Sequence, residues 1–280
     1  MRLLDYNSFI NQDRQKPQSV NEHLWSGIIH RSETGRVRKE DMIPCDTKED
    51  IREKIQKIID ETHPNEGETI NLNHLDVSRV EDMSGLFFDD VLSKYNYNVS
   101  NWDVSKVTDM SSMFFDCEKF NCDLSRWDVS KVTDMSFMFY GCGDFNSDLS
   151  RWDVSNVTSM SLMFNGCKIF NSDLSGWKVS NVENMNFMFS RCGDFNGDLS
   201  NWDVSNVKYM QDMFEYCTNF NSDLSGWKVS KVKNMYSMFC NCKNFNCDLS
   251  NWDVSKVIDM NYMFNGCSSL KKKPDWFHGR

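Results

Sequence analysis

Length, composition and charge describe a globular chain that is neither disordered nor strongly basic. The 280 residues are 40% hydrophobic and 13% aromatic, which is enough to bury a core and excludes general disorder. The net charge of −10 argues against nucleic acid as a partner, no stretch approaches the roughly 18 apolar residues of a membrane span, and the first residues lack the pattern of a secretory signal.

The beginning of the chain does not follow the pattern that dominates the rest. Residues 1–43 form an N-terminal extension of unknown structure, either an ordered extension or a partner-binding arm. Residues 44–70 are predicted to be a capping helix and a linker, because Thr47 and Asp50 resemble a capping box. Helical spacing from Thr47 to Glu61 places four apolar side chains on one face: Ile51, Ile55, Ile58 and Ile59. This helix is expected to cover the open end of the first repeat.

A 25-residue phrase repeats through residues 71–270, in one degenerate and seven regular copies. One copy, beginning at Arg126, reads RWDVSKVTDMSFMFYGCGDFNSDLS. Trp, the Met-Phe pair, Cys and a second Phe keep their places from copy to copy. A fixed period of this length predicts a solenoid, in which no single copy can bury its large apolar side chains alone.

Two periodicities lie inside each copy. In residues 124–129 (LSRWDV), apolar and polar residues alternate in the L-x-x-L-x-L form of a leucine-rich-repeat strand. In residues 132–139, Val, Met, Met and Phe recur at i, i+3, i+6 and i+7, as on one face of a helix. The expected fold class is therefore an α/β repeat solenoid, leucine-rich-repeat-like, with one short parallel strand and a short helix or helical turn per repeat.

Polar columns in the repeat are interpreted first as structural. An Asn follows the second aromatic residue of each copy, and side chains in such a ladder usually bond backbone groups that a turn leaves unpaired. Calcium held by stacked Asn and Asp oxygens is the alternative, but the Gly-rich nonapeptide of calcium-binding β-rolls is absent. We therefore predict no metal and no cofactor.

The cysteines follow the repeat rather than a disulfide framework. Seven of the 11 occupy one column: Cys117, Cys142, Cys167, Cys192, Cys217, Cys242 and Cys267. A thiol between aromatic residues is usually a small buried hydrophobe, and a ladder of thiols does not form a tetrahedral metal cage. Free thiols predict the cytoplasm or another reducing compartment.

The end of the sequence departs from the repeat. Residues 271–280 are predicted to be a C-terminal cap or tail, in which Pro274 stops the pattern while Trp276 and Phe277 cover the last copy. Three consecutive lysines, from Lys271, form either a small site for an anionic partner or a solvated tail.

The repeat motif VTDMSFMFYGCGDFNSDLSRWDVS resembles the BspA-like leucine-rich-repeat family, in its 25-residue branch that is common in bacterial surface lipoproteins and some viral proteins. The resemblance extends from Pro44 to Trp276. It implies a right-handed solenoid, a role in binding or adhesion, and the cell surface as an alternative location. A signal peptide and a lipobox cysteine, which many members carry, are absent here.

Motifs of catalysis are missing, and we expect no enzyme. The sequence has no Gly-rich phosphate loop, no metal-spaced His pair and no nucleophile elbow. The favoured function is a non-catalytic scaffold that binds a protein partner through the strand face. There the residues after each Trp form a row: Asp103, Asp128, Asp153, Lys178, Asp203, Lys228 and Asp253. Its first three aspartates either recognise a basic surface or only keep the sheet soluble.

A structural role is the alternative: a surface component that self-assembles, or an adhesin for host or matrix ligands. It draws on an apolar strip on the helical side of the repeat, made by Phe137, Leu162 and Phe187. Such a strip is either covered by the N-terminal arm or is itself an interface.

Overall fold

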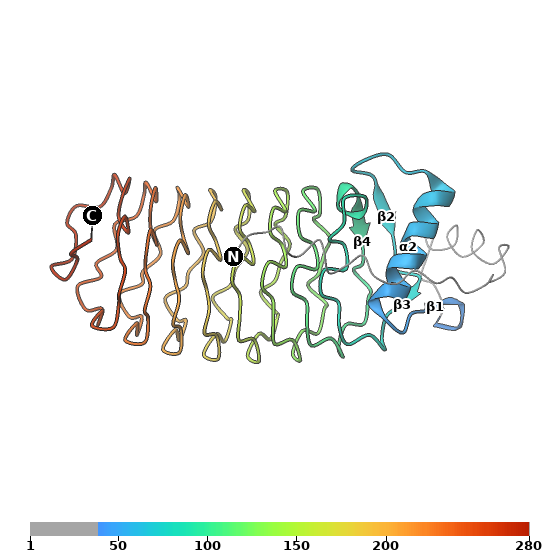
Figure 1. The fold of residues 1–280 in the computed structure, drawn as a ribbon, viewed down its shortest axis with the longest axis horizontal. Coiled ribbons are helices and arrows are strands. Elements are labelled where there is room, and N and C mark those ends of the chain that lie inside the picture. Colours follow the sequence, from blue (N-terminus) through green and yellow to red (C-terminus); the bar gives the residue numbers. More distant parts are fainter. Residues whose placement is uncertain (1–38, 280) are drawn as a thin grey trace.

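The protein is described by a computed structural model over residues 39–279. The N-terminal extension predicted over residues 1–43 therefore lies outside the described residues, apart from residues 39–43. In the described part, the chain winds into a row of similar coils, one for each 25-residue copy, stacked along the longest axis (Figure 1). We call each such turn of the chain a coil.

Regular secondary structure is confined to the N-terminal end of this stack. The elements, in chain order, are η2 (Lys39–Asp41), β1 (Ile43–Pro44), α2 (Lys48–Thr62), β2 (Thr69–Asn71), β3 (Leu75–Asp76), η3 (Leu92–Lys94) and β4 (Asn96–Asn98). β1 pairs in parallel with β3, and β2 pairs in parallel with β4, with Ile70 opposite Tyr97. These short pairs lead the chain into the first coils.

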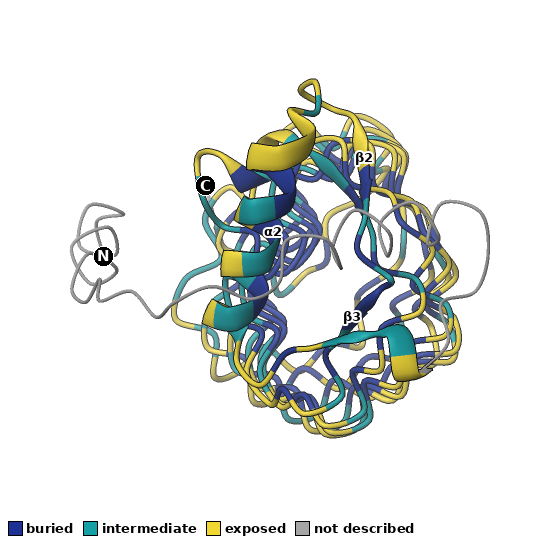
Figure 2. Ribbon diagram, turned by 90° about the vertical axis from the view of Figure 1, so that its right-hand side faces the viewer, coloured by how far each residue is buried: buried dark blue, intermediate teal, exposed yellow. Residues whose placement is uncertain are grey.

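Helix α2 lies across this end of the stack with its apolar face inward (Figure 2). The predicted helix is therefore present, and the Thr47 side chain accepts the backbone N–H of Asp50 at 3.2 Å as its N-cap. All four isoleucines that the periodicity placed on one face are buried: Ile51, Ile55, Ile58 and Ile59.

Cationic side chains of α2 complete the backbone hydrogen bonding of the first coil. In later coils, the carbonyl at the Ser111 position accepts an N–H from the preceding coil. The first coil has no predecessor at this position, and there Lys48 Nζ donates to the Ser84 carbonyl at 3.2 Å. Arg52 adds a bond of 3.3 Å to the Gly85 carbonyl, which also accepts the Phe88 N–H. α2 thus caps the stack by burial and by hydrogen bonding.

The coils are held together by a parallel ladder that runs through residues 133–141 and their equivalents. The N–H groups of Met135, Phe137 and Phe139 donate to the next coil at 2.8–3.1 Å. Isolated parallel bridges connect the coils at one position of every copy: Asp82, Asp109, Asp134, Ser159, Asn184, Tyr209, Asn234 and Asp259. The ladder therefore lies in the stretch in which the periodicity predicts a helix.

Neither element expected within a regular copy is formed as such. Residues 132–139 contain turns instead of a helix. Alternate backbone N–H groups donate to carbonyls of the next coil, and Phe137 adopts a positive φ of 59°. Residues 124–129 contain a turn closed by the Trp127 N–H and the Leu124 carbonyl, with no bridge to a neighbouring coil. The apolar positions were identified correctly, but turns produce the same inward spacing as a helix would.

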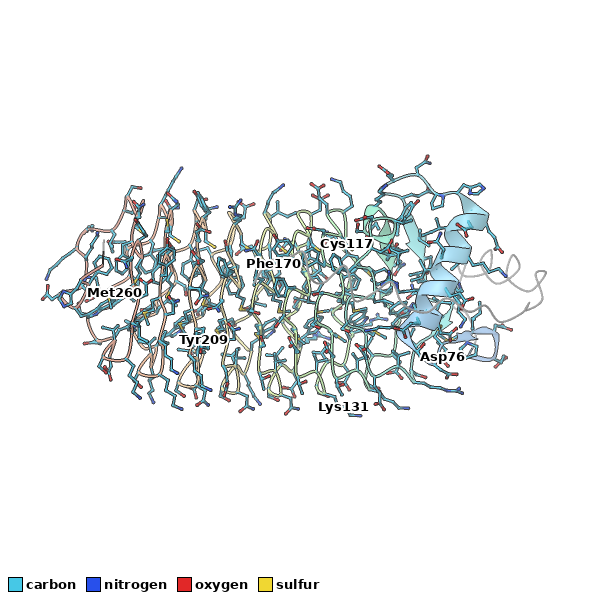
Figure 3. All side chains as sticks on the ribbon, viewed as in Figure 1. Asp76, Cys117, Lys131, Phe170, Tyr209 and Met260 are labelled. Carbon is cyan, nitrogen blue, oxygen red and sulfur yellow. The ribbon has the colours of Figure 1, made fainter. Side chains whose placement is uncertain are left out.

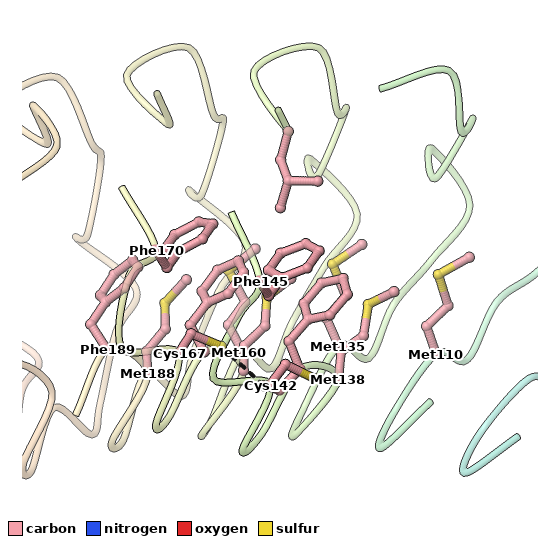
Figure 4. Packing of buried hydrophobic residues seen from close by; sticks show 14 of the residues in the cluster. Met110, Met135, Met138, Cys142, Phe145, Met160, Cys167, Phe170, Met188 and Phe189 are labelled. Carbon is pink, nitrogen blue, oxygen red and sulfur yellow. Dashed lines mark hydrogen bonds between the residues drawn. The ribbon is translucent and has the colours of Figure 1, made fainter. Parts of the chain in front are cut away.

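The core is a set of columns that run the length of the stack (Figures 3 and 4). Phe139 stacks on Phe145 within its coil at 4.0 Å and on Phe164 of the next coil at 5.7 Å between ring centroids. The indole N–H of Trp127 donates to the Val99 carbonyl at 3.1 Å, a bond that recurs in the other coils. At the far end, Trp276 continues the column by stacking on Trp252.

Candidate functional site

The row of residues that follow each Trp is exposed and belongs to turns. Asp103, Asp128 and Asp153 each accept the backbone N–H of the serine two residues later at 3.1 Å, as do Asp203 and Asp253. For Asp128 and Asp153, hydrogen bonds from that serine lower the pKa of the carboxyl group. The row therefore has a structural role in capping turns, and it lies on a turn edge rather than on the bridged stretch.

Two lysines interrupt this row. Lys178 and Lys228 are exposed at the positions that aspartates occupy in the other coils. Asp153 and Asp203 are the nearest acidic neighbours, and Lys178 and Lys228 respectively help to lower their pKa. The structure thus keeps the predicted row together, with its charge broken at two coils.

The Asn column forms a ladder, which confirms the structural interpretation. The side-chain oxygen of Asn121 accepts the N–H of Asn146 at 3.0 Å, and Asn146 does the same for Asn171 at 2.8 Å. The Asp column beside it accepts serine N–H groups at 2.9 Å. Within residues 39–279, no group of three or more His, Cys, Asp or Glu side chains is placed to hold a metal ion.

All eleven cysteines are free thiols, and those of the main column are buried or half-buried. The Cys142 thiol donates to the Phe114 carbonyl at 3.0 Å, and Cys167 makes the equivalent bond to Phe139. Burial raises the pKa of Cys45 and of Cys267 to about 12. A thiol that stays protonated is a poor nucleophile, so these side chains are packing groups.

The predicted apolar strip is a real surface feature. Phe137, Leu162 and Phe187 occupy one column on successive coils and are half-buried. All three are held at positive φ, between 55° and 59°. Aromatic rings extend the strip toward the N-terminal end, where Phe115 lies 4.5 Å from Tyr140 and 6.1 Å from Phe137 between ring centroids.

A groove of about 750 Å³ lies along this strip. Its lining includes Tyr140, Leu162 and Phe187, and two glycines in consecutive coils, Gly141 and Gly166. Both glycines have positive φ, 73° and 80°, and a Cβ on Gly141 would lie 2.2 Å from Asp116 Oδ1. Other coils carry Asp116, Arg191, Tyr216 or Asn241 at this position, so the glycines lower the surface here.

Charged side chains surround the groove unevenly. Asp116 and Glu118 line it in one coil, Lys168 and Arg191 in the middle, and Glu215 at the C-terminal end. The Arg191 guanidinium lies over the Tyr216 ring, 5.7 Å from its centroid.

One buried carboxyl group continues the column of the strip beyond Phe187. Asp212 is 7% exposed, and burial followed by the charge of Glu215 raises its pKa to about 7. Glu215 accepts a hydrogen bond from the Ser190 hydroxyl at 3.2 Å.

Sequence reasoning identified the strip but missed the groove and the buried acid. The strip residues were found because their column varies between coils and holds three apolar residues in succession. The same signal was present at the position before each Cys, which is Gly only at Gly141, Gly166 and Gly266. Asp212 carried a signal too, since it is the only charged residue in its column.

Comparison with protein families assigns most of the described chain. The family described as "Mycoplasma protein of unknown function, DUF285" matches residues 54–177 and 159–277. Comparison with curated proteins finds no significant match. No helix within residues 39–279 has the length and apolar composition needed to cross a bilayer. Since the two matched ranges together run from residue 54 to residue 277, the chain belongs to the DUF285 family, whose members are built from repeats.

Proposed function

We propose that this protein is a non-catalytic interaction scaffold, a repeat solenoid of the BspA-like leucine-rich-repeat kind, that binds a segment of a protein partner. The observation that carries the proposal is the groove over Gly141 and Gly166. The groove lies where two variable columns, those of Leu162 and Gly166, depart from the strict repeat, whereas the core columns stay constant. Side chains that vary at the surface of a constant frame are where a repeat protein acquires specificity.

The dimensions and lining of the groove favour an extended peptide. A volume of about 750 Å³ lies within the range of ligand sites. The apolar side chains of Leu162 and Phe187 lie side by side on neighbouring coils, and charged groups occur at both ends. An apolar strip with a polar rim suits a segment that inserts one or two apolar side chains and is oriented by charge.

The thiols support both the absence of catalysis and the compartment that we propose. Buried Cys side chains with raised pKa values are unreactive, and the column bonds to backbone carbonyls instead of to other thiols. Eleven free thiols suit the cytoplasm or another reducing compartment. Display at a cell surface, as the resemblance implies, is the alternative location.

The experiment blocks the groove with a residue that the chain already uses. Gly166→Arg places in this coil the side chain that Arg191 carries in the next coil, at a similar positive φ. Short linear peptides selected on the full chain from a random display library should lose binding to this variant, as measured by fluorescence anisotropy. The control is Ile258→Thr, which removes an apolar side chain that is 86% exposed outside the groove and restores the residue of other coils.

Two outcomes would contradict the proposal. One is that no selected peptide binds, or that binding survives Gly166→Arg while it is lost in Ile258→Thr. The other concerns the chain's own residues 1–38, which lie outside the described part. A photoreactive amino acid in place of Leu162 that crosslinks to residues 1–38, and not to an added peptide, would assign the groove to an internal segment.

Self-assembly is the second candidate function, and the aromatic rings beside the strip favour it. Phe88, Phe115 and Tyr140 form a continuous series on three coils, with centroids 4.5 Å apart at each step. Half-buried aromatic side chains in a row are typical of an interface. Sedimentation that depends on concentration, and that Phe115→Asp abolishes, would support this role, whereas a monomer at all concentrations would exclude it.

A further inference from the structure

We infer that Glu215, at the C-terminal end of the groove, and Asp212, which follows Phe187 in the column of the strip, form an acceptor site for a lysine or arginine side chain of the bound segment. This inference rests on the proposed function of the groove and specifies the chemistry of its occupant. The partner segment would place an apolar side chain on Leu162 and Phe187 and a basic side chain one or two coils further along.

The first observation is a buried acid without a partner. The Asp212 side chain is 7% exposed and makes no hydrogen bond or ion pair with any residue in the range 39–279. A charged group that is removed from water is costly unless an opposite charge or hydrogen-bond donors compensate it. The other regular coils avoid this cost, because their residues in the same column are uncharged: Ser112, Phe137, Leu162, Phe187, Ser237 and Tyr262.

The second observation is a neighbouring carboxylate that opens onto the groove. Glu215 lines the groove, and its charge contributes to the raised pKa of Asp212. The two acids belong to one turn, in which the Glu215 backbone N–H donates to the Asp212 carbonyl at 3.1 Å, and a cation between their side chains would relieve their repulsion. Burial and then the charges of Glu215 and Asp212 raise the pKa of the neighbouring Cys240 thiol, so this thiol stays neutral.

The third observation is that the nearest cation of the groove is engaged elsewhere. Arg191 lies one coil before Glu215, and the Arg191 N–H donates to the Glu215 carbonyl at 2.7 Å. The Arg191 guanidinium nevertheless lies over the Tyr216 ring, 5.7 Å from its centroid. None of the ion pairs within residues 39–279 joins a cation to Asp212 or Glu215, so a basic side chain of the bound segment would be their counter-charge.

The strip leads directly to this site. Leu162, Phe187 and Asp212 are equivalent residues of three successive coils, and the ladder bonds of this column fix their order. Neighbouring coils are separated by roughly the 4.8 Å of adjacent strands. An extended segment advances about 3.3 Å per residue, so its apolar and basic side chains would be separated by only a few residues.

The test uses the full chain and peptides selected on it from a random linear library. Selected sequences should share a lysine or arginine at a fixed short distance from an aromatic or aliphatic residue. Asp212→Ser and Glu215→Ser, which copy the residues of Ser237 and Ser190, should each weaken these peptides by roughly tenfold or more, measured by isothermal titration calorimetry. Replacement of the basic residue of the peptide by norleucine should weaken binding to the native chain but not to the Asp212→Ser variant.

Glu183→Thr is the control variant. It removes one acidic charge in the coil of Phe187, outside the groove lining, and restores the threonine of Thr158. It should leave the affinity within about twofold, because exposed charges contribute little. Affinity of the native chain for basic peptides should also rise as the pH increases through about 7, where Asp212 becomes ionised, and this rise should be absent in Asp212→Ser.

Failure of this inference can be distinguished from failure of the proposed function. Peptides that bind, that are lost in Gly166→Arg, but that show no basic preference or bind Asp212→Ser and Glu215→Ser unchanged, would leave the groove as a binding site and overturn the acceptor site. If no peptide depends on Gly166, both are overturned.

Discussion

The Trp column and the column of the apolar strip occur in the same coils, yet the residue is constant in the first column and varies in the second. Trp is unchanged from Trp102 to Trp252 and is at most 4% exposed throughout. The strip column contains Ser112, Phe137, Leu162, Phe187, Asp212, Ser237 and Tyr262, always at φ between 51° and 59°. In the first column packing fixes the residue, whereas in the second the ladder fixes only the backbone. The backbone can therefore stay constant while the side chain changes.

The largest expected loss of stability comes from a substitution in the constant Trp column. Trp177→Ala removes stacking with Trp152 and Trp202, both at 6.4 Å, and the indole bond to the Leu149 carbonyl. We expect the free energy of unfolding to fall by about 3–5 kcal/mol, as for other buried aromatic residues. The measurement is urea denaturation followed by circular dichroism.

Phe187→Ser is the matching substitution in the variable column of the apolar strip. Serine already occupies this column at Ser112 and Ser237, at the same positive φ. The stability should change by less than about 1 kcal/mol, since the side chain is half-buried and the position tolerates serine. A loss equal to that of Trp177→Ala would show that the strip belongs to the core.

The capped end and the coil of Asp212 should respond to pH in opposite directions, because burial lowers the pKa of His74 and raises the pKa of Asp212. His74 is fully buried, and burial lowers its pKa to about 4, although a backbone hydrogen bond with Asn71 acts in the opposite direction. Between its ordinary pKa of about 6.5 and about 4, the unfolded chain binds the proton and the folded chain does not. The contribution of His74 to stability is therefore complete above a pH of about 6.5 and falls as the pH decreases, by roughly 3 kcal/mol in total.

His74→Leu isolates that contribution. The difference in unfolding free energy between the variant and the native chain should shift in favour of the variant as the pH falls from about 6.5 to 5. The opposite slope that Asp212 contributes in this range is present in both chains and cancels from the difference. An unchanged slope would mean that other groups cause the acid sensitivity. Thermal denaturation at several pH values gives the comparison.

The two groove glycines, Gly141 and Gly166, should differ in how much stability an alanine substitution costs. A Cβ on Gly141 would lie 2.2 Å from Asp116 Oδ1 and 3.3 Å from its Cα, whereas a Cβ on Gly166 would lie 3.5 Å from the Gly141 Cα. Both glycines have positive φ, so alanine costs about 1 kcal/mol in each. Gly141→Ala should cost more than Gly166→Ala because the Asp116 side chain must also move. Equal losses would show that Asp116 moves without cost.

The contrast between constant and variable columns also explains which features could be predicted from the sequence. The period, the buried positions and the capping helix with Thr47 could be predicted, because burial and capping leave direct patterns. Residues 132–139, for which a short helix or helical turn was predicted, form turns whose alternate N–H groups donate to the next coil, and these turns give the apolar residues the same spacing as a helix. The groove could not be predicted, since it requires knowing that the columns of Leu162 and Gly166 share one surface.

The smallest expected effect separates two roles of the acidic row. Asp128 is exposed, and its carboxylate accepts the Ser130 N–H at 3.1 Å, which lowers its pKa. Asp128→Ala should cost about 0.5 kcal/mol, the lower end for a hydrogen bond, because water replaces the acceptor. Asp128→Asn keeps the acceptor and removes the charge, so stability should not change. If the groove is the site, peptides selected on the chain should bind Asp128→Asn unchanged in anisotropy titrations. A loss of binding without a loss of stability would instead support the hypothesis that the acidic row recognises a basic partner, because only the charge distinguishes this variant from the native chain.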